Sequence, residues 1–258
     1  MLLAVDVGNT QTVLGLYEGE RLCFMWRIAT TKSHTADELR IKLLALLAAV
    51  GVSVEDVSGM ALASVVPRLT SSWTGVCNCL FGIEALVVNA KTAGALFETS
   101  YRNPAEIGAD RVADAVAARH LYGAPVLVVD FGTATNIEVL DAQGLFVGGL
   151  IAPGMETSAN ALFAQAARLS AIELCAPAVV VGRTTDEAVQ SGIVYGEAAR
   201  VDGLVRMIFD ELGYLAPVIA TGGLAPIVAK HSLFITQTNL ELTLVGLRLI
   251  WESVHTPL

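Results

Sequence analysis

One short pattern occurs twice in the chain and constrains its fold more than any other feature. Residues 3–10 read LAVDVGNT, and residues 127–135 read LVVDFGTAT. In each copy an apolar run ends in Asp-x-Gly, which is typical of a strand that is buried on both faces and leads into a tight turn. Glycine lets the backbone approach a ligand closely, and carboxylate, amide and hydroxyl groups suit phosphate oxygens and their metal. Each copy therefore predicts a phosphate-binding turn.

The segments that follow the two turns also match. Residues 12–17 and 22–28 predict two strands joined by a turn, and residues 137–140 and 145–151 predict the same pair in the second half. The two copies align with one residue of slack at the turn. We interpret the match as an internal duplication, in which each half opens with three hairpin-connected strands and the two turns face a shared cleft.

The rest of the chain alternates between helix and strand patterns, which indicates an α/β fold. Predicted helices span residues 35–49, 68–80, 109–121, 157–169, 185–212 and 240–254, and predicted strands span residues 60–66, 85–88 and 217–221. Thr35 and Glu38 form a candidate capping box at the start of the first helix. We expect two domains, residues 1–118 and 119–258, because 258 residues are enough to give each a core.

Composition and charge exclude several classes of protein. Hydrophobic residues make up 54% of the chain, but the longest apolar stretch, residues 43–54, is shorter than the ~20 residues that a membrane-spanning helix needs. The N-terminus lacks a basic region and soon reaches Asp6, so we expect a cytoplasmic protein with no signal peptide and no membrane partner. The net charge of −9 and the lack of a basic run argue against nucleic-acid binding.

Three further segments carry chemical potential. Residues 104–111, PAEIGADR, place Asp110 beside Arg111, where a carboxylate can accept a hydroxyl proton and a guanidinium can bind an anion. Residues 148–154, GGLIAPG, lead from a strand into a helix, whose free amide groups favour an anion. Residues 221–223, TGG, would let the backbone approach a flat ring. The structural alternatives are an acidic residue offsetting a helix dipole, a plain turn and a structural glycine pair.

Taken together, these motifs resemble those of type III pantothenate kinases. The two turns and the three further segments match that family in order and spacing from residue 3 to about residue 224. The resemblance implies a duplicated ribonuclease H-like (actin-like ATPase) fold, with two mixed five-stranded sheets flanked by helices and an interdomain cleft. It also implies ATP-dependent phosphorylation of pantothenate to 4'-phosphopantothenate, the first step of coenzyme A biosynthesis.

The resemblance further implies roles for individual residues. Asp110 would act as general base for in-line attack on ATP, and Arg111 would orient the substrate or stabilise transferred charge. Cofactor contacts are implied for Asp6, Val7, Gly8, Asn9, Thr10, Gln11, Thr12, Val13, Thr133, Gly222 and Gly223. Substrate contacts are implied for Tyr101, Gly108, Ala109, Asp110, Arg111 and Thr185. Asp6 would lie near Mg²⁺, and Asp130 would hold a monovalent cation, K⁺ or NH4⁺.

A homodimer is also implied, with Thr185 reaching the pocket of the neighbouring chain. Three structural alternatives stay open: Asp130 caps its turn, Tyr101 is a core aromatic residue, and Thr185 is only a helix N-cap. The chain departs from the family pattern at Asn136, where a second Thr is common, and at Thr184, where Asn is usual. Both residues still donate and accept hydrogen bonds.

Two other functions remain open at this point. One is a different small-molecule kinase on the same fold, which we would expect to place its base in another motif, since fold alone does not fix substrate. The other is a nonenzymatic nucleotide-binding regulator, which we would expect to have lost Asp110. The chain retains Asp110 and Arg111, and it contains no Walker motif.

Overall fold

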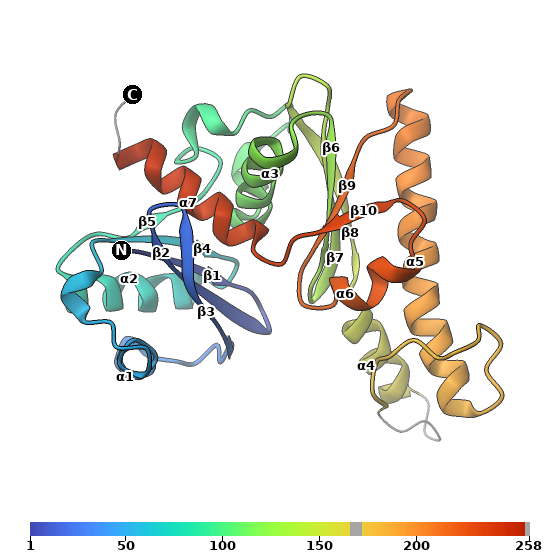
Figure 1. The fold of residues 1–258 in the computed structure, drawn as a ribbon, viewed down its shortest axis with the longest axis horizontal. Helices are drawn as coiled ribbons and strands as arrows, with labels where there is room; N and C mark the ends of the chain where they lie inside the picture. Colours follow the sequence, from blue (N-terminus) through green and yellow to red (C-terminus); the bar gives the residue numbers. More distant parts are fainter. Residues whose placement is uncertain (166–171, 256–258) are drawn as a thin grey trace. The chain divides into compact units, whose positions relative to one another are not determined.

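The structure is a computed structural model that describes residues 1–165 and 172–255. The chain forms two compact units (Figure 1). One unit contains residues 1–117 together with the C-terminal helix α7 (Leu242–His255), and the other contains residues 118–241. Each unit is built on a mixed five-stranded sheet flanked by helices, which confirms the predicted α/β class.

The first sheet has the strand order β3-β2-β1-β4-β5. Its strands are β1 (Leu2–Val7), β2 (Gln11–Glu18), β3 (Arg21–Ala29), β4 (Gly59–Ser64) and β5 (Leu86–Val87). The helices that accompany it are α1 (Ala36–Ala49), α2 (Pro67–Phe81) and the start of α3 (Ala109–Tyr122), with short 3-10 turns η1 (Val54–Asp56), η2 (Gly94–Leu96) and η3 (Pro104–Glu106). The first three strands pair as antiparallel hairpins, and β4 joins β1 in parallel.

The second sheet has the order β10-β9-β6-β7-β8. Its strands are β6 (Val126–Phe131), β7 (Ala134–Leu140), β8 (Phe146–Pro153), β9 (Val218–Thr221) and β10 (Ile235–Thr238), and its helices are α4 (Met155–Gln165), α5 (Thr185–Leu212), α6 (Ala225–Val228) and the 3-10 turn η4 (Ala229–His231). Three strands again form a meander whose first strand pairs in parallel with a later one. The two sheets therefore share one topology, as the duplication predicts. Positions 166–169 of the predicted helix 157–169 lie outside the described residues.

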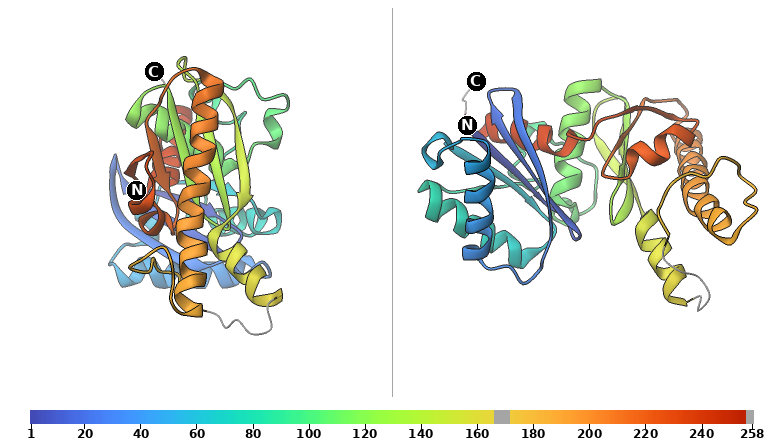
Figure 2. Two further views of the ribbon diagram at one scale, coloured as in Figure 1. Left: turned by 90° about the vertical axis from the view of Figure 1, so that its right-hand side faces the viewer. Right: turned by 60° about the horizontal axis from the view of Figure 1, so that its bottom comes forward.

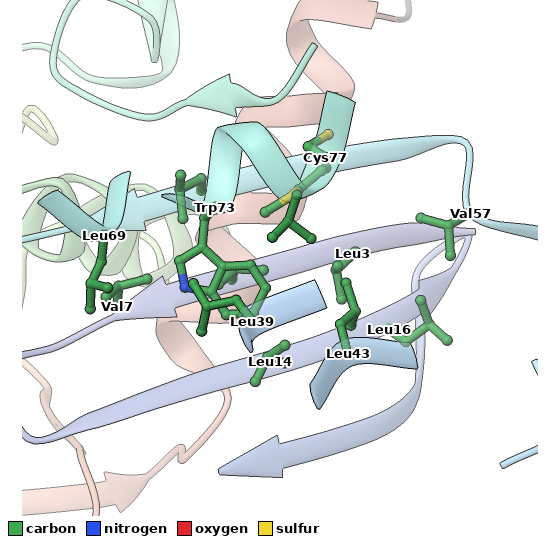
Figure 3. Packing of buried hydrophobic residues seen from close by; sticks show 14 of the residues in the cluster. Leu3, Val7, Leu14, Leu16, Leu39, Leu43, Val57, Leu69, Trp73 and Cys77 are labelled. Carbon is green, nitrogen blue, oxygen red and sulfur yellow. The ribbon is translucent and has the colours of Figure 1, made fainter. Parts of the chain in front are cut away.

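Helices α1 and α2 cover one face of the first sheet (Figure 2). Leu3 and Val7 of β1 and Leu14 of β2 point toward Leu43 and Trp73 of these helices, and all five are almost fully buried (Figure 3). Burying a large apolar side chain contributes about 1.5–3 kcal/mol. This packing fixes which face of β1 is apolar, and it leaves Asp6 on the opposite face, because side chains alternate along a strand.

The start of α1 has the predicted capping box. Thr35 Oγ1 accepts a hydrogen bond from the Glu38 amide at 3.3 Å, and Glu38 Oε2 accepts one from the Thr35 amide at 2.8 Å. The Thr35 amide and hydroxyl lower the pKa of the Glu38 carboxyl because they stabilise its charged form. The sequence signal at this helix start is thus confirmed.

The opposite face of the first sheet is covered by α7. This helix contacts β1 and β4, and a Cβ atom on Gly59 would collide with the indole of Trp251. Thr243 Oγ1 donates to the buried carboxylate of Asp114 in α3 at 2.6 Å. The sequence-based boundary placed this helix in the second domain, residues 119–258. Its contacts instead place it with the first unit, because an apolar helix packs on whichever sheet face is left uncovered.

The core of the second unit lies between its sheet and α5, the long orange helix of Figure 2. Leu127 and Val129 of β6 pack with Val194 and Val201 of α5. None of the helices in the described part of the chain combines the length and the apolarity that a membrane crossing requires. The second unit thus repeats the first, with the long helix α5 on this face of the sheet beside Met155 of α4 and Val228 of α6.

Candidate active site

The first Asp-x-Gly turn joins β1 to β2. Asp6 is partly buried near the end of β1, and the Gly8 amide donates to the Gln11 carbonyl at 3.0 Å. A Cβ atom on Gly8 would lie 2.9 Å from that carbonyl oxygen, which is too close for a side chain. Residues 9–11 are exposed. The turn therefore needs glycine to close, and it presents its other side chains to solvent.

Thr12 and Val13 follow this turn in β2, and their side chains lie on opposite faces of the sheet. Thr12 is buried, and its hydroxyl lies 2.8 Å from that of Thr30. The Thr30 amide donates to the Thr10 carbonyl at 2.9 Å. Val13 is partly buried and lies opposite Asp6 in the strand pairing. Thr12 thus supports the turn from inside the unit.

Asp110 occupies the first turn of α3. The Gly108 carbonyl accepts the first helical hydrogen bond of α3, and Asp110 Oδ1 accepts one from the Arg111 amide at 2.9 Å. A Cβ atom on Gly108 would collide with Asp110 Oδ1. Burial raises the pKa of the Asp110 carboxyl, and the Arg111 amide and charge oppose that rise only in part. The glycine of the Gly-x-Asp-Arg motif therefore makes room for the carboxylate.

The start of α3 lies at the same sheet edge as the first turn. Since β1 and β4 run parallel, their carboxyl ends meet at one edge, where open α/β sheets usually bind ligands. The Val65 amide, just past β4, donates to the Val7 carbonyl at 3.1 Å. Val65 Cγ1 would lie 3.9 Å from a Cβ on Gly108. This chain of contacts brings Asp110 to the edge that carries Asp6.

The other predicted substrate residues flank Asp110. Ala109 is buried, and Arg111 is only 7% exposed although it lies in the first turn of a helix. The Arg111 side chain therefore does not project into solvent, where charged side chains usually lie. Tyr101 is partly buried in the loop before η3, and its amide donates to Thr99 Oγ1 at 2.9 Å. Local hydrogen bonds thus order the loop that carries Tyr101.

The second turn is one residue shorter than the first. Its Gly132 amide donates to the Ala134 carbonyl at 3.0 Å, and Thr133 is exposed. The Thr133 carbonyl accepts hydrogen bonds from the Gly154 amide at 3.1 Å and from Thr157 Oγ1 at 2.6 Å. A Cβ atom on Gly154 would collide with the turn backbone. We expected the free amides before α4 to bind an anion. The Gly154 amide instead supports the turn through its hydrogen bond to Thr133.

Asp130 lies at the end of β6, between Asn136 of β7 and Thr221 of β9. Gly222 has a φ of 89°, and a Cβ atom there would collide with Asp130 Oδ1. Gly223 is exposed and has open space at its Cβ position. The Asn136 Oδ1 atom is buried and accepts no hydrogen bond from any described residue. The two glycines thus differ, since Gly222 packs against Asp130 and only Gly223 is open.

The N-terminus of α5 distinguishes two neighbouring threonines. Thr184 is the N-cap, because its Oγ1 accepts a hydrogen bond from the Glu187 amide at 3.2 Å. Thr185, which sequence reasoning left open as a cap, is instead the exposed first residue of the helix. It lines a groove of about 670 Å³ between α4 and α5, together with Glu197 and Arg200. Sequence reasoning missed this last pair because charged residues in a helix usually face solvent.

The duplicated fold and its two Asp-x-Gly turns define the class of the protein as a two-unit α/β protein of the actin-like ATPase fold. At the level of fold, the chain is similar to the activator of 2-hydroxyisocaproyl-CoA dehydratase from Clostridium difficile with bound ADPNP. That likeness has a TM-score of 0.57 and 15% identity, and it covers 96% of this chain and 92% of the other.

The sequence comparisons identify the family. The family model for type III pantothenate kinase matches residues 2–207. Proteins of that name from Roseiflexus sp. and Frankia casuarinae are 44% and 46% identical over 252 and 254 residues, which cover 98% of this chain and 98% and 99% of theirs. The chain belongs to the type III pantothenate kinase family. The prediction of this family is confirmed, and with it the prediction of a kinase.

Proposed function

We propose that the chain transfers the γ-phosphoryl group of ATP to the primary hydroxyl of pantothenate and so forms 4'-phosphopantothenate. The observation that carries the proposal is the carboxylate of Asp110, which lies at the sheet edge of the first Asp-x-Gly turn. Gly108 makes room for it, and burial raises its pKa. Family membership supports the choice of substrate.

Asp110 acts as general base in this proposal. Its carboxylate accepts the hydroxyl proton while the hydroxyl oxygen attacks the γ-phosphorus in line, and the bond to the β–γ bridging oxygen breaks to release ADP. A carboxylate whose pKa is raised is a better proton acceptor than an exposed aspartate. Arg111 orients the substrate or stabilises the transferred charge. Phosphoryl transfer needs mostly positioning and charge stabilisation, which these groups can supply.

The nucleotide is held by both turns, one in each unit. The exposed residues 9–11 and Thr133 contact phosphate oxygens, and the carboxylate of Asp6 lies near Mg²⁺, a cation that prefers oxygen ligands. When bound, Mg²⁺ neutralises phosphate charge. The adenosine lies beside Gly223. The next residue, Leu224, lines a groove of about 500 Å³ together with Phe163 and Ile227 among others.

A monovalent cation fits the surroundings of Asp130. The carboxylate pairs across the sheet with Asn136, whose buried Oδ1 accepts no hydrogen bond from the described residues. Directly opposed residues of antiparallel strands lie on one face, so both oxygens can serve one K⁺ or NH4⁺. The cation supplies positive charge near the second turn. Asn136, where the family often has Thr, thus offers its side-chain amide oxygen as a ligand for the cation.

The active form is a homodimer in which Thr185 reaches the pocket of the partner. Three consecutive valines, residues 179–181, are exposed just before α5. Gly192 and Gly196 on α5 are exposed and leave an open face that another chain can approach closely. Exposed apolar surface of this kind marks interaction sites. Thr185 does not cap α5, because Thr184 is the N-cap.

The testing experiment is a phosphorylation assay on the purified protein with MgATP. It compares pantothenate with a set of sugars and polyols as acceptors, and K⁺ with Na⁺ as the only added monovalent cation. We expect K⁺-dependent formation of 4'-phosphopantothenate and no transfer to the other hydroxyl acceptors. No product from pantothenate, with a folded protein that binds ATP, would contradict the proposal.

A further inference from the structure

A buried carboxylate that no motif predicts lies directly behind the second turn. Glu197, in the middle of α5, is only 5% exposed, and its Oε1 accepts a hydrogen bond from Thr135 Oγ1 at 2.6 Å. Thr135 is buried as well and is the residue with which β7 leaves the turn. A buried carboxylate is costly unless it is paired and hydrogen-bonded. The burial of the Glu197 carboxylate therefore indicates that its contacts matter to the fold or the site.

Arg200 pairs with this carboxylate and extends the connection. Its Nη2 lies 2.5 Å from Glu197 Oε2 and donates to the Pro153 carbonyl at 2.8 Å. Pro153 directly precedes Gly154, whose amide donates to the Thr133 carbonyl. The contacts thus close a ring that holds the turn at two points. Thr133 is held from the junction of β8 and α4, and Thr135 is held from α5.

The first unit provides an internal comparison. Thr12 occupies the position in its hairpin that Thr135 occupies in the second, because each is the first paired residue after its turn. Among the described residues, however, the hydroxyl of Thr12 bonds only to the neutral hydroxyl of Thr30. Hydrogen bonds to an ionised group are roughly twice as strong as neutral ones. The duplicated hydroxyl therefore has a stronger anchor in the second unit.

We propose that Glu197 is a positioning residue for nucleotide binding at the second turn. Its carboxylate fixes the hydroxyl of Thr135, and Arg200 ties that carboxylate to the strand end that supports Thr133. The turn is thereby held ready before the nucleotide arrives, so binding does not have to order it. This inference rests on the proposed function, since it assigns the second turn to the phosphates of ATP.

The test measures MgADP binding by titration calorimetry on the full chain. Glu197→Gln keeps an acceptor for Thr135 but removes the charge that pairs with Arg200. We expect its Kd for MgADP to rise roughly tenfold, as the loss of a charge-assisted hydrogen bond predicts. Glu211→Gln, the same change at an exposed position of α5, is the matched control and leaves the Kd unchanged. A wild-type protein that does not bind MgADP would instead contradict the proposed function.

A second pair of variants separates positioning from folding. Thr135→Ser keeps the hydroxyl and binds MgADP like the wild type, whereas Thr135→Val loses it and weakens binding as Glu197→Gln does. If both residues act through the same connection to the turn, the effects of the two substitutions are not additive, and the double variant Thr135→Val, Glu197→Gln binds MgADP about as weakly as the weaker single variant. A lower melting temperature with an unchanged Kd, or fully additive effects, would overturn the inference. If Glu197→Gln does not fold, the Thr135 pair still decides the question.

Discussion

The position of the Asp110 carboxylate depends on the absence of a side chain at Gly108. Gly108 leaves the space into which the Asp110 carboxylate turns, and the Arg111 amide holds one carboxylate oxygen. Burial disfavours the ionised form, while the helix N-terminus and the amide favour it. Burial is the larger effect, so the pKa of the carboxyl is raised. The motif thus yields a stronger base than an exposed first-turn aspartate.

Substituting Gly108 with alanine tests this arrangement. The added methyl group collides with Asp110 Oδ1 and displaces the carboxylate. We expect Gly108→Ala to lower kcat by about 10²-fold, since small misplacements of a catalytic group have effects of that size. Steady-state kinetics with thermal melting provide the measurement. Gly75→Ala in α2, where the new methyl meets Ala36 at an ordinary 3.5 Å, is the control and keeps wild-type kcat.

The pKa of Asp110 predicts the acid limb of the pH–rate profile. The base works only when it is ionised, so kcat/KM falls as the pH drops through a pKa above the usual ~3.9 of aspartate. Because the folded pKa exceeds the unfolded one, stability contributed by this group is full below ~3.9 and is lost as the pH rises through the folded pKa. Asp110→Asn should therefore gain stability over the wild type with rising pH. An acid limb at the ordinary value would contradict this account.

At the residue scale the sequence alone predicts motifs better than partners. It singles out Asp110 and Gly108, because their types and spacing are unusual. It does not find Glu197, because only the fold shows that this residue faces Thr135. It also leaves open whether Thr185 caps its helix, since Thr184 is an equally good cap by type.

At the element scale, the end of β9 supports the candidate cation site at Asp130 on the neighbouring strand β6. Gly222 follows β9 with a positive φ and packs against Asp130 and the Phe131 carbonyl of β6. The next residue, Gly223, has open space instead. The backbone that follows β9 therefore packs directly against the Asp130 carboxylate.

The two glycines form a matched pair for mutation. Gly222→Ala forces a side chain into a left-handed backbone and against Asp130, so we expect a loss of about 1–3 kcal/mol in the free energy of unfolding. Gly223→Ala should change that free energy by less than about 0.5 kcal/mol. Urea denaturation of both variants measures the difference. Equal stability of the two would show that the Asp130 contact is not close.

Elements with a strong pattern were predicted closely, and short or polar ones were not. The meander strands β1 to β3 and β6 to β8 follow the apolar runs, because burial on a sheet imposes that pattern. The strand β10 was missed because three of its four residues, 236–238, are exposed. The helix α6 was missed because it is only four residues long. The placement of α7 with the first unit depends on contacts distant in sequence.

At the scale of the whole molecule, the duplication gives two units of one topology, and each contains some of the proposed site residues. The first unit carries Asp110 and the turn at Asp6. The second carries Asp130, the shorter turn and Gly223. In the proposed dimer, Thr185 adds a group from the partner chain. In that proposal each site also depends on a second copy of the chain.

Mixing two inactive variants tests that dependence. Asp110→Asn lacks the base, and Thr185→Arg blocks the contribution to the partner's pocket. If Thr185 acts across the dimer, a mixed dimer contains one intact site, and reassembled mixtures regain roughly a quarter of wild-type activity. Activity after denaturation and joint refolding is the measurement. If Thr185 acted within its own chain, the mixture would stay inactive.

In the proposed mechanism Asp110 accepts the hydroxyl proton at the edge of the first turn. The most direct measurement is single-turnover phosphorylation of pantothenate by Asp110→Asn, with calorimetric binding of MgADP and of pantothenate on the same preparation. We predict binding close to wild type and a transfer rate lower by about 10²–10⁴-fold, the usual contribution of a general base. Transfer at the wild-type rate would contradict the account and place the base elsewhere.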